Sequence, residues 1–231
     1  ATVDDGNGGT KNASANLTIS NSIPVVDSVA LSPTTAYTNT SLSASVVFSD
    51  QDSDQASSLF GSYEWHVISS GNDAIVQAGT QNTLSDSFFV RGDEVYVIVT
   101  PNDGIINGTP VTSLSVAIVN SPPSQPSIDI TPDPALESDD LVCSITTEAT
   151  DEDGDIVVYS YEWFDPSGQS QSTTTLTTNL DDIFLAAGTS EGTWTCTVTP
   201  HDGIEYGSVV TTYVSVDGCP DCGQMAYTTP G

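Results

Sequence analysis

The chain has 231 residues, of which 37% are hydrophobic and 14% are charged, and this composition suits one or two folded domains. Only two basic residues, Lys11 and Arg91, face 31 acidic ones, so the formal net charge is −29. A surface of this charge repels nucleic acids and anionic membranes, and we expect neither as a partner. No apolar run approaches the roughly 18 residues of a membrane-spanning helix, so we expect no direct membrane insertion.

The acidic excess also bears on the surroundings of the chain. Like charges in a compact state repel one another, and salt or divalent cations would offset that repulsion. This favours a saline or calcium-bearing exterior. The simpler alternative is a solvated acidic surface that binds no ion.

Residues 1–21 resemble the end of a repeat that recurs later in the chain. The motif Thr2-Val3-Asp4-Asp5-Gly6 matches residues 100–104, and residues 15–21 match 115–120 in character. We therefore expect 1–21 to hold the last strands of a preceding repeat in a longer array. The alternative is that residues 10–20 are a strand donated to an identical subunit.

Residues 22–121 form the first full repeat. A short proline-containing linker at 22–24 opens it, and segments rich in Val, Phe, Tyr and Thr predict β-strands with no amphipathic helix. The expected strands are 25–31, 42–49, 59–68, 74–78, 83–90, 94–100 and 109–119.

Residues 122–218 form a second copy. Thr100-Pro101-Asn102-Asp103-Gly104-Ile105 recurs as 199–204 and Tyr63-Glu64-Trp65 recurs as 161–163, both after 98 or 99 residues. One period shared by separate motifs indicates duplicated domains of about 100 residues, the size of an immunoglobulin-like domain. The expected strands are 126–131, 140–149, 156–164, 169–177, 181–186, 192–199 and 207–216.

Two cysteines in the second repeat predict a structural disulfide. Cys143 and Cys196 lie in alternating β segments with Trp163 between them, which is the pattern of an immunoglobulin-like sandwich. The aligned residues of the first repeat are Ala44 and Val97, an apolar pair, so a structural bridge is favoured over redox chemistry. In the chain-entropy model such a bridge contributes at most roughly 4 kcal/mol.

A tail at 219–231 contains Cys219-Pro220-Asp221-Cys222. We interpret this pair as a local disulfide or the start of another module rather than a zinc site, since only His66 and His201 could supply further nitrogen ligands. Four cysteines in an acidic β protein suit an oxidising, extracellular compartment.

Acidic residues alternate in the turn before each Tyr-Glu-Trp strand. Carboxylates spaced in this way around a turn can converge on calcium, and in an immunoglobulin-like sandwich the Asp-Gly turn after 94–100 or 192–199 lies at the same pole. The alternative is a solvated turn in which Asp-Gly only supplies turn geometry. The candidate calcium ligands are Asp50, Asp52, Asp54, Asp103, Asp151, Asp153, Asp155 and Asp202.

On these residues the repeats resemble the immunoglobulin-like, PKD-like and cadherin-like modules of large bacterial and archaeal surface proteins. The resemblance is carried by the acidic motif at 151–155 and by the turns at Asp103-Gly104 and Asp202-Gly203. It implies an all-β fold of tandem antiparallel sandwiches, a secreted or cell-surface location, no catalysis, and calcium that stiffens successive domains.

Three functions follow from these expectations. The first is a non-enzymatic stalk, spacer or adhesive arm whose partners are neighbouring repeats. The second is an extracellular filament built by strand donation from 10–20. The third is a carbohydrate-binding accessory module that binds surface glycans, for which Tyr206 and Tyr213 are the candidate aromatics. The integrin-type tripeptide Arg91-Gly92-Asp93 is interpreted as ordinary turn sequence.

Overall fold

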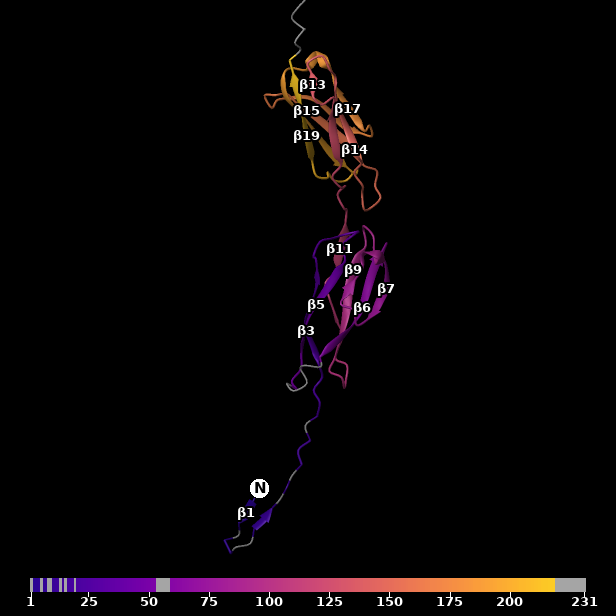
Figure 1. The fold of residues 1–231 in the computed structure, drawn as a ribbon. Coiled ribbons are helices and arrows are strands. Elements are labelled where there is room, and N and C mark those ends of the chain that lie inside the picture. Colours follow the sequence, from indigo (N-terminus) through magenta and orange to yellow (C-terminus); the bar gives the residue numbers. More distant parts are fainter. Residues whose placement is uncertain are drawn as a thin grey trace, which may run out of the picture.

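The structure is a computed structural model that describes residues 2–4, 6–7, 10–12, 14, 16–18, 20–52 and 59–218. A two-stranded hairpin precedes two β-sandwiches that follow one another end to end (Figure 1). Apart from two short 3₁₀ turns, the described secondary structure is β-strand, and no helix among these residues is long and apolar enough to cross a membrane. The predicted cysteine pair Cys219 and Cys222 lies outside the described residues.

The first sandwich packs a three-stranded sheet against a larger one. The small sheet consists of β3 (Val25–Ser32), β5 (Leu42–Ser49) and β8 (Thr83–Leu84). The larger sheet consists of β4 (Ala36–Tyr37), β11 (Val116–Val119), β9 (Glu94–Asn102), β6 (Phe60–Ser69) and β7 (Asn72–Gly79), with β10 (Val111–Thr112) also beside β9. A 3₁₀ turn, η2 (Asp86–Phe88), follows β8.

The second sandwich repeats this arrangement. Its small sheet consists of β12 (Ser127–Thr131), β14 (Leu141–Thr147) and β17 (Asp181–Phe184). Its larger sheet consists of β13 (Ala135–Leu136), β19 (Val210–Asp217), β18 (Gly192–His201), β15 (Val158–Phe164) and β16 (Ser170–Thr177), and η3 (Ala186–Gly188) follows β17. The predicted tandem sandwiches are thus confirmed.

Each core is built around the tryptophan of the Tyr-Glu-Trp motif. Trp65 and Trp163 are both fully buried, because alternate residues of β6 and β15 face the opposing sheet. Each indole N–H finds an acceptor, the carbonyl of Gln81 in one case and Asp182 Oδ2 in the other. The two tryptophans therefore occupy equivalent, satisfied positions in two separate cores.

The disulfide predicted in the second repeat is present. Cys143 on β14 and Cys196 on β18 join the two sheets, with their Cα atoms 6.5 Å apart. Ala44 and Val97, the aligned residues of the first sandwich, are buried and fill the same place without a covalent bond.

Trp194, which stands two residues before Cys196, is buried and donates from Nε1 to the carbonyl of Ser190 at 2.8 Å. It therefore ties the turn before β18 to the core, as the corner tyrosine does in antibody domains. The equivalent residue of the first sandwich is Val95.

Some strands differ from the prediction. The two-residue strands β4 and β13 were not predicted, and they pair in parallel with β11 and β19, so each larger sheet is mixed. The expected strand 83–90 ends early because Ser85 caps η2. The expected strand 109–119 is interrupted, since the Ser113 hydroxyl accepts the N–H of Val97 and Leu114 points into solvent.

The hairpin of β1 (Thr2–Asp4) and β2 (Thr10–Asn12) has the register of the corresponding pair in both sandwiches. Val3 pairs with Lys11, and the positions 98 residues later fall in the register in which β9 pairs with β10. The positions 197 residues later fall in the register of β18 with β19. The described residues between 14 and 20 are not in a strand.

Candidate functional site

The most elaborate polar structure of the molecule lies where each linker enters a sandwich. We call these places the first junction, around residues 21–24, and the second junction, around residues 120–123. The two junctions share an Asn, a Ser, acidic turns and a Pro–Gly contact at equivalent positions.

At the first junction, two linker residues bind three of the predicted acidic residues. Asn21 Nδ2 donates to Asp103 Oδ2 at 2.7 Å. The backbone N–H of Ser22 donates to Asp52 Oδ2 at 2.6 Å, and its hydroxyl donates to Asp50 Oδ1 at 2.7 Å. The turn before β6 and the turn after β9 are therefore both attached to the linker.

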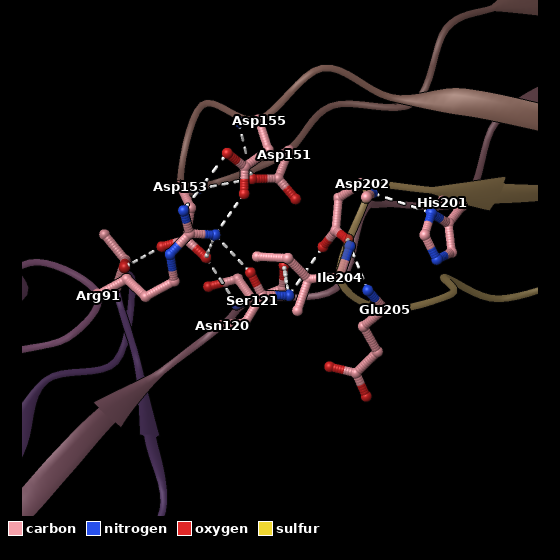
Figure 2. Close-up of polar contacts among 12 residues, drawn as sticks. Arg91, Asn120, Ser121, Asp151, Asp153, Asp155, His201, Asp202, Ile204 and Glu205 are labelled. Carbon is pink, nitrogen blue, oxygen red and sulfur yellow. Dashed lines mark hydrogen bonds and ion pairs between the residues drawn. The ribbon is translucent and has the colours of Figure 1, made fainter.

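The second junction repeats the amide and backbone contacts (Figure 2), whereas the hydroxyl of Ser121 is buried without a hydrogen-bond partner. Asn120 Nδ2 donates to Asp202 Oδ2 at 2.8 Å, and the N–H of Ser121 donates to Asp153 Oδ2 at 2.7 Å. The side chain of Asp153 is only 2% exposed. The predicted convergence of both acidic turns at one pole is therefore present here as well.

The acidic turns are shaped by their own carboxylates. Asp50 Oδ1 accepts the N–H of Asp52 at 2.8 Å, and Asp151 Oδ1 accepts the N–H of Asp153 at 2.9 Å. Asp-led turns of this kind reverse the chain by a side-chain to backbone hydrogen bond. Much of the acidic pattern thus serves turn geometry, as the simpler alternative proposed.

Asp103 and Asp202 each hold the turn after the central strand. Asp103 Oδ1 accepts two backbone N–H groups at 2.7 Å, and Asp202 Oδ1 accepts two at 2.6 Å. The hydrogen bond from Asn21, together with backbone N–H groups, lowers the pKa of Asp103. Burial acts to raise the pKa of Asp202, but the bond from Asn120 and the backbone donors outweigh it and lower that pKa.

A proline packed on a glycine completes each junction. This contact was not predicted from the sequence. A Cβ atom on Gly108 would lie 1.9 Å from the carbonyl oxygen of Pro24. A Cβ atom on Gly207 would lie 2.4 Å from the carbonyl oxygen of Pro123. Both prolines are buried. The signal was in the sequence, because both pairs recur with the same 99-residue offset.

Arg91, in the turn before β9, connects the first sandwich to the second junction. Its Nη1 donates to Asn120 Oδ1 at 2.5 Å, forms an ion pair with Asp155, and lies 3.7 Å from Asp153 Oδ2. The hydrogen bond to Asp155 raises the pKa of the guanidinium. Thr38, also from the first sandwich, donates its hydroxyl to Asp153. These contacts join one sandwich directly to the next.

The Arg91-Gly92-Asp93 tripeptide is not presented as an adhesive loop. The Arg91 side chain is engaged at the second junction, and Asp93 is buried and accepts the N–H of Val90 at 2.9 Å. This agrees with its interpretation as turn sequence.

The predicted calcium ligands form two groups but no closed cage. Within the described ranges, no three His, Cys, Asp or Glu side chains lie close enough together to hold a metal ion. Asp54 is outside those ranges. One carboxylate oxygen in each junction, Asp50 Oδ2 and Asp151 Oδ2, is buried without a hydrogen-bond partner. Such an oxygen fits a cation, since burying an unsatisfied charged group is costly.

Outside the junctions, one polar cluster joins His66, Asp73 and Tyr96, and His66 Nε2 is buried there without a hydrogen-bond partner. His66 Nδ1 lies 2.9 Å from Asp73 Oδ1, and the Tyr96 hydroxyl donates to Asp73 Oδ2 at 2.6 Å. This hydrogen bond, with burial, raises the pKa of Tyr96 to about 12. With this pKa the Tyr96 hydroxyl stays protonated at neutral pH and acts as a hydrogen-bond donor to Asp73.

The two candidate glycan-binding tyrosines do not form one platform. Tyr206 is 58% exposed and stacks edge-on against His201, whereas Tyr213 is 74% exposed and pairs with Thr195. His201 and Thr195 are six residues apart along β18, which corresponds to about 20 Å.

Comparison with known proteins supports the fold and goes no further. No model of a known protein family matches the chain, and no curated protein matches it. The chicken interferon gamma receptor alpha chain is similar in structure, with a TM-score of 0.50, 10% identity, and coverage of 86% of this chain and 99% of the receptor chain.

Two other solved structures have lower scores. A two-domain fibronectin type III segment of chicken tenascin gives a TM-score of 0.44 with 12% identity, covering 85% of this chain and 99% of that one. The FN1–FN3 domains of chicken CNTN1 give a TM-score of 0.36 with 11% identity, and the match covers 85% of this chain and 65% of that one. The sheet topology and the likeness to the receptor chain make this chain a tandem pair of immunoglobulin-like β-sandwiches by fold.

Proposed function

We propose that this chain is a non-enzymatic structural segment of an acidic extracellular protein, in which junctions of one design hold successive sandwiches in line. The observation that carries the proposal is the repetition of the junction. An Asn–Asp bond, a Ser–Asp bond and a proline packed on a glycine occur at both linkers. A flexible linker would not need contacts that fix both acidic turns. A rigid spacer needs such contacts to hold successive sandwiches in line.

The path of the chain supports a spacer. Each linker enters a sandwich at the pole of its acidic turns, and the chain leaves the first sandwich through β11 towards the second (Figure 1). The disulfide and the resemblance to surface-protein modules favour an extracellular, prokaryotic setting.

The hairpin at the start of the chain favours an array over a strand-donated filament. Residues 10–12 pair with 2–4 of the same chain, in the register of the later repeats. Each sandwich already contains its own last strand, β11 or β19, so a donated strand has no vacant place in either of them. This supports the assignment of 1–21 to a preceding repeat.

Substitution of a junction glycine tests the spacer. Gly207→Ala places a methyl group against the Pro123 carbonyl, so the linker must move, whereas the matched variant Ser208→Ala changes an exposed neighbour. We expect small-angle scattering to give a broader distance distribution for Gly207→Ala than for the wild type or Ser208→Ala. An unchanged distribution in a folded Gly207→Ala protein contradicts the spacer role.

We also propose that calcium binds at the first junction, on Asp50, Asp52 and Asp103. The buried, unpartnered oxygen Asp50 Oδ2 supports this, together with the absence of a basic side chain from the contacts described there. Bound calcium would draw together these carboxylates, which do not converge on a metal position in the structure, and would neutralise their mutual repulsion.

The calcium proposal is tested by titration calorimetry on the whole chain. We expect Asp50→Asn to weaken calcium binding while Asp86→Asn, in a 3₁₀ turn that makes no contact described at either junction, does not. A chelator should lower the melting temperature of the wild type. If binding is equal in both variants, calcium does not bind at this junction.

A further inference from the structure

The second junction contains a cation of its own. In a chain with 31 acidic residues, one of only two basic side chains is placed among the carboxylates of this junction. The Arg91 side chain is 33% exposed and is therefore partly shielded from solvent. An ion pair in such a place is screened less by salt than an exposed pair.

We propose that the Arg91 guanidinium takes the place of a divalent cation at the second junction, so that this junction is rigid without calcium and becomes calcium-dependent when the guanidinium is removed. The inference rests on the proposed spacer function and concerns how one of its junctions is held. It predicts that the two junctions of one chain differ in their response to calcium.

The position of Nη1 supports this exchange. It lies among oxygen atoms of three residues, namely Asn120 Oδ1 at 2.5 Å, Asp155 Oδ2 in an ion pair, and Asp153 Oδ2 at 3.7 Å. Amide and carboxylate oxygens of this kind are the ligands that calcium prefers. These side chains do not form a cage around a metal position while Arg91 is present, so they must move inward to coordinate a cation once the guanidinium is removed.

A buried oxygen in the same turn provides a further ligand. Asp151 Oδ2 is buried and has no hydrogen-bond partner, although Asp151 Oδ1 accepts two backbone N–H groups. The guanidinium supplies charge to this turn but leaves that oxygen unbound. A divalent ion in place of Arg91 could use it.

The corresponding turn of the second sandwich has no arginine. The residue 99 positions after Arg91 is Ser190, and Glu191 follows it. The guanidinium is therefore specific to the junction between these two sandwiches rather than a general feature of the repeat.

The experiment removes the charge of each basic residue in turn. Arg91→Met keeps the length of the aliphatic stem but not the guanidinium, and Lys11→Met makes the same change in net charge far from the second junction along the chain. Both are made in the full chain carrying Asp50→Asn, which removes the calcium site proposed at the first junction. Scattering and calcium calorimetry are measured with chelator and with excess calcium.

We expect Arg91→Met to broaden the distance distribution in chelator, to regain the narrow distribution with calcium, and to bind calcium at least about tenfold more tightly than the Lys11→Met protein. Circular dichroism of Arg91→Met should remain that of the folded sandwiches. The proposal is overturned if Arg91→Met stays narrow in chelator, or if calcium fails to restore it. A broad Gly207→Ala distribution alongside either result would leave the spacer function standing.

Discussion

One aspartate in each sandwich links a turn to the chain that precedes it. Asp202 accepts backbone N–H groups of its own turn with one oxygen and the Asn120 amide with the other. Asp103 does the same with Asn21. Because these bonds favour the ionised carboxylate, they contribute to stability only while the group is charged.

The contribution of Asp202 should therefore depend on pH. Its pKa is lower in the folded state than in the unfolded state, so the stabilisation is complete above the unfolded pKa and is lost as the pH falls through the folded value. We expect wild type to exceed Asp202→Asn in free energy of unfolding by about 1–3 kcal/mol at neutral pH. The difference should shrink below about pH 4. Urea denaturation across this range measures it, and a difference that persists unchanged in strong acid contradicts the assignment.

At the scale of elements, the two sandwiches offer a natural comparison of a bridged and an unbridged core. Cys143 and Cys196 join β14 to β18, while Ala44 and Val97 hold the same positions by packing alone. The bridge acts mainly by restricting the unfolded chain of the second sandwich.

Replacing the disulfide of the second sandwich by the apolar pair of the first should therefore destabilise only the second sandwich. The variant Cys143→Ala/Cys196→Val is expected to lower the free energy of unfolding of the second sandwich by about 2–4 kcal/mol. The first sandwich serves as an internal control in scanning calorimetry, because its unfolding transition should be unchanged. Equal destabilisation of both transitions would mean that the sandwiches unfold as one unit.

Long strands could be predicted from the sequence because burial and alternation agree in them. The strand predicted at 42–49 is found at β5 (Leu42–Ser49), and the one predicted at 169–177 is found at β16 (Ser170–Thr177). The strands β4 and β13 have two residues each, too few for a periodic pattern, and they are held by distant partners. Short strands were therefore missed, and the predicted strands 83–90 and 109–119 were too long because contacts of Ser85 and Ser113 interrupt them.

The junctions were predicted only in part for a related reason. The acidic turns stand out as local spacing, and the shared pole follows from the fold class. The contacts of Arg91 and of Gly207 depend on how a linker and a neighbouring sandwich approach in space, and spacing along the chain does not contain that information.

At the scale of the whole molecule, charge repulsion opposes compactness. The chain carries 31 acidic residues against only two basic ones, Lys11 and Arg91, which leaves a net charge of −29. Screening by dissolved ions should reduce this repulsion without any specific binding.

Stability should therefore rise with ionic strength. Between about 0.01 M and about 0.15 M monovalent salt, the screening length falls from about 30 Å to about 8 Å. We expect the melting temperature, followed by circular dichroism in the presence of chelator, to rise by a few degrees. Choline chloride and sodium chloride should act equally, because only screening is involved. A melting temperature that falls with both salts would contradict this explanation.

The parallel pairing of β4 with β11 and of β13 with β19 determines how the molecule responds to tension. The chain enters the first sandwich through β3 and leaves directly after β11, so a pull on the two ends should first free β3 from β5 and then draw β4 and β11 lengthwise past each other. Their hydrogen bonds are then strained together, whereas peeling would break them singly. Each sandwich thus carries a small mechanical clamp at its exit, and a chain of such sandwiches should extend stepwise under force, one domain at a time.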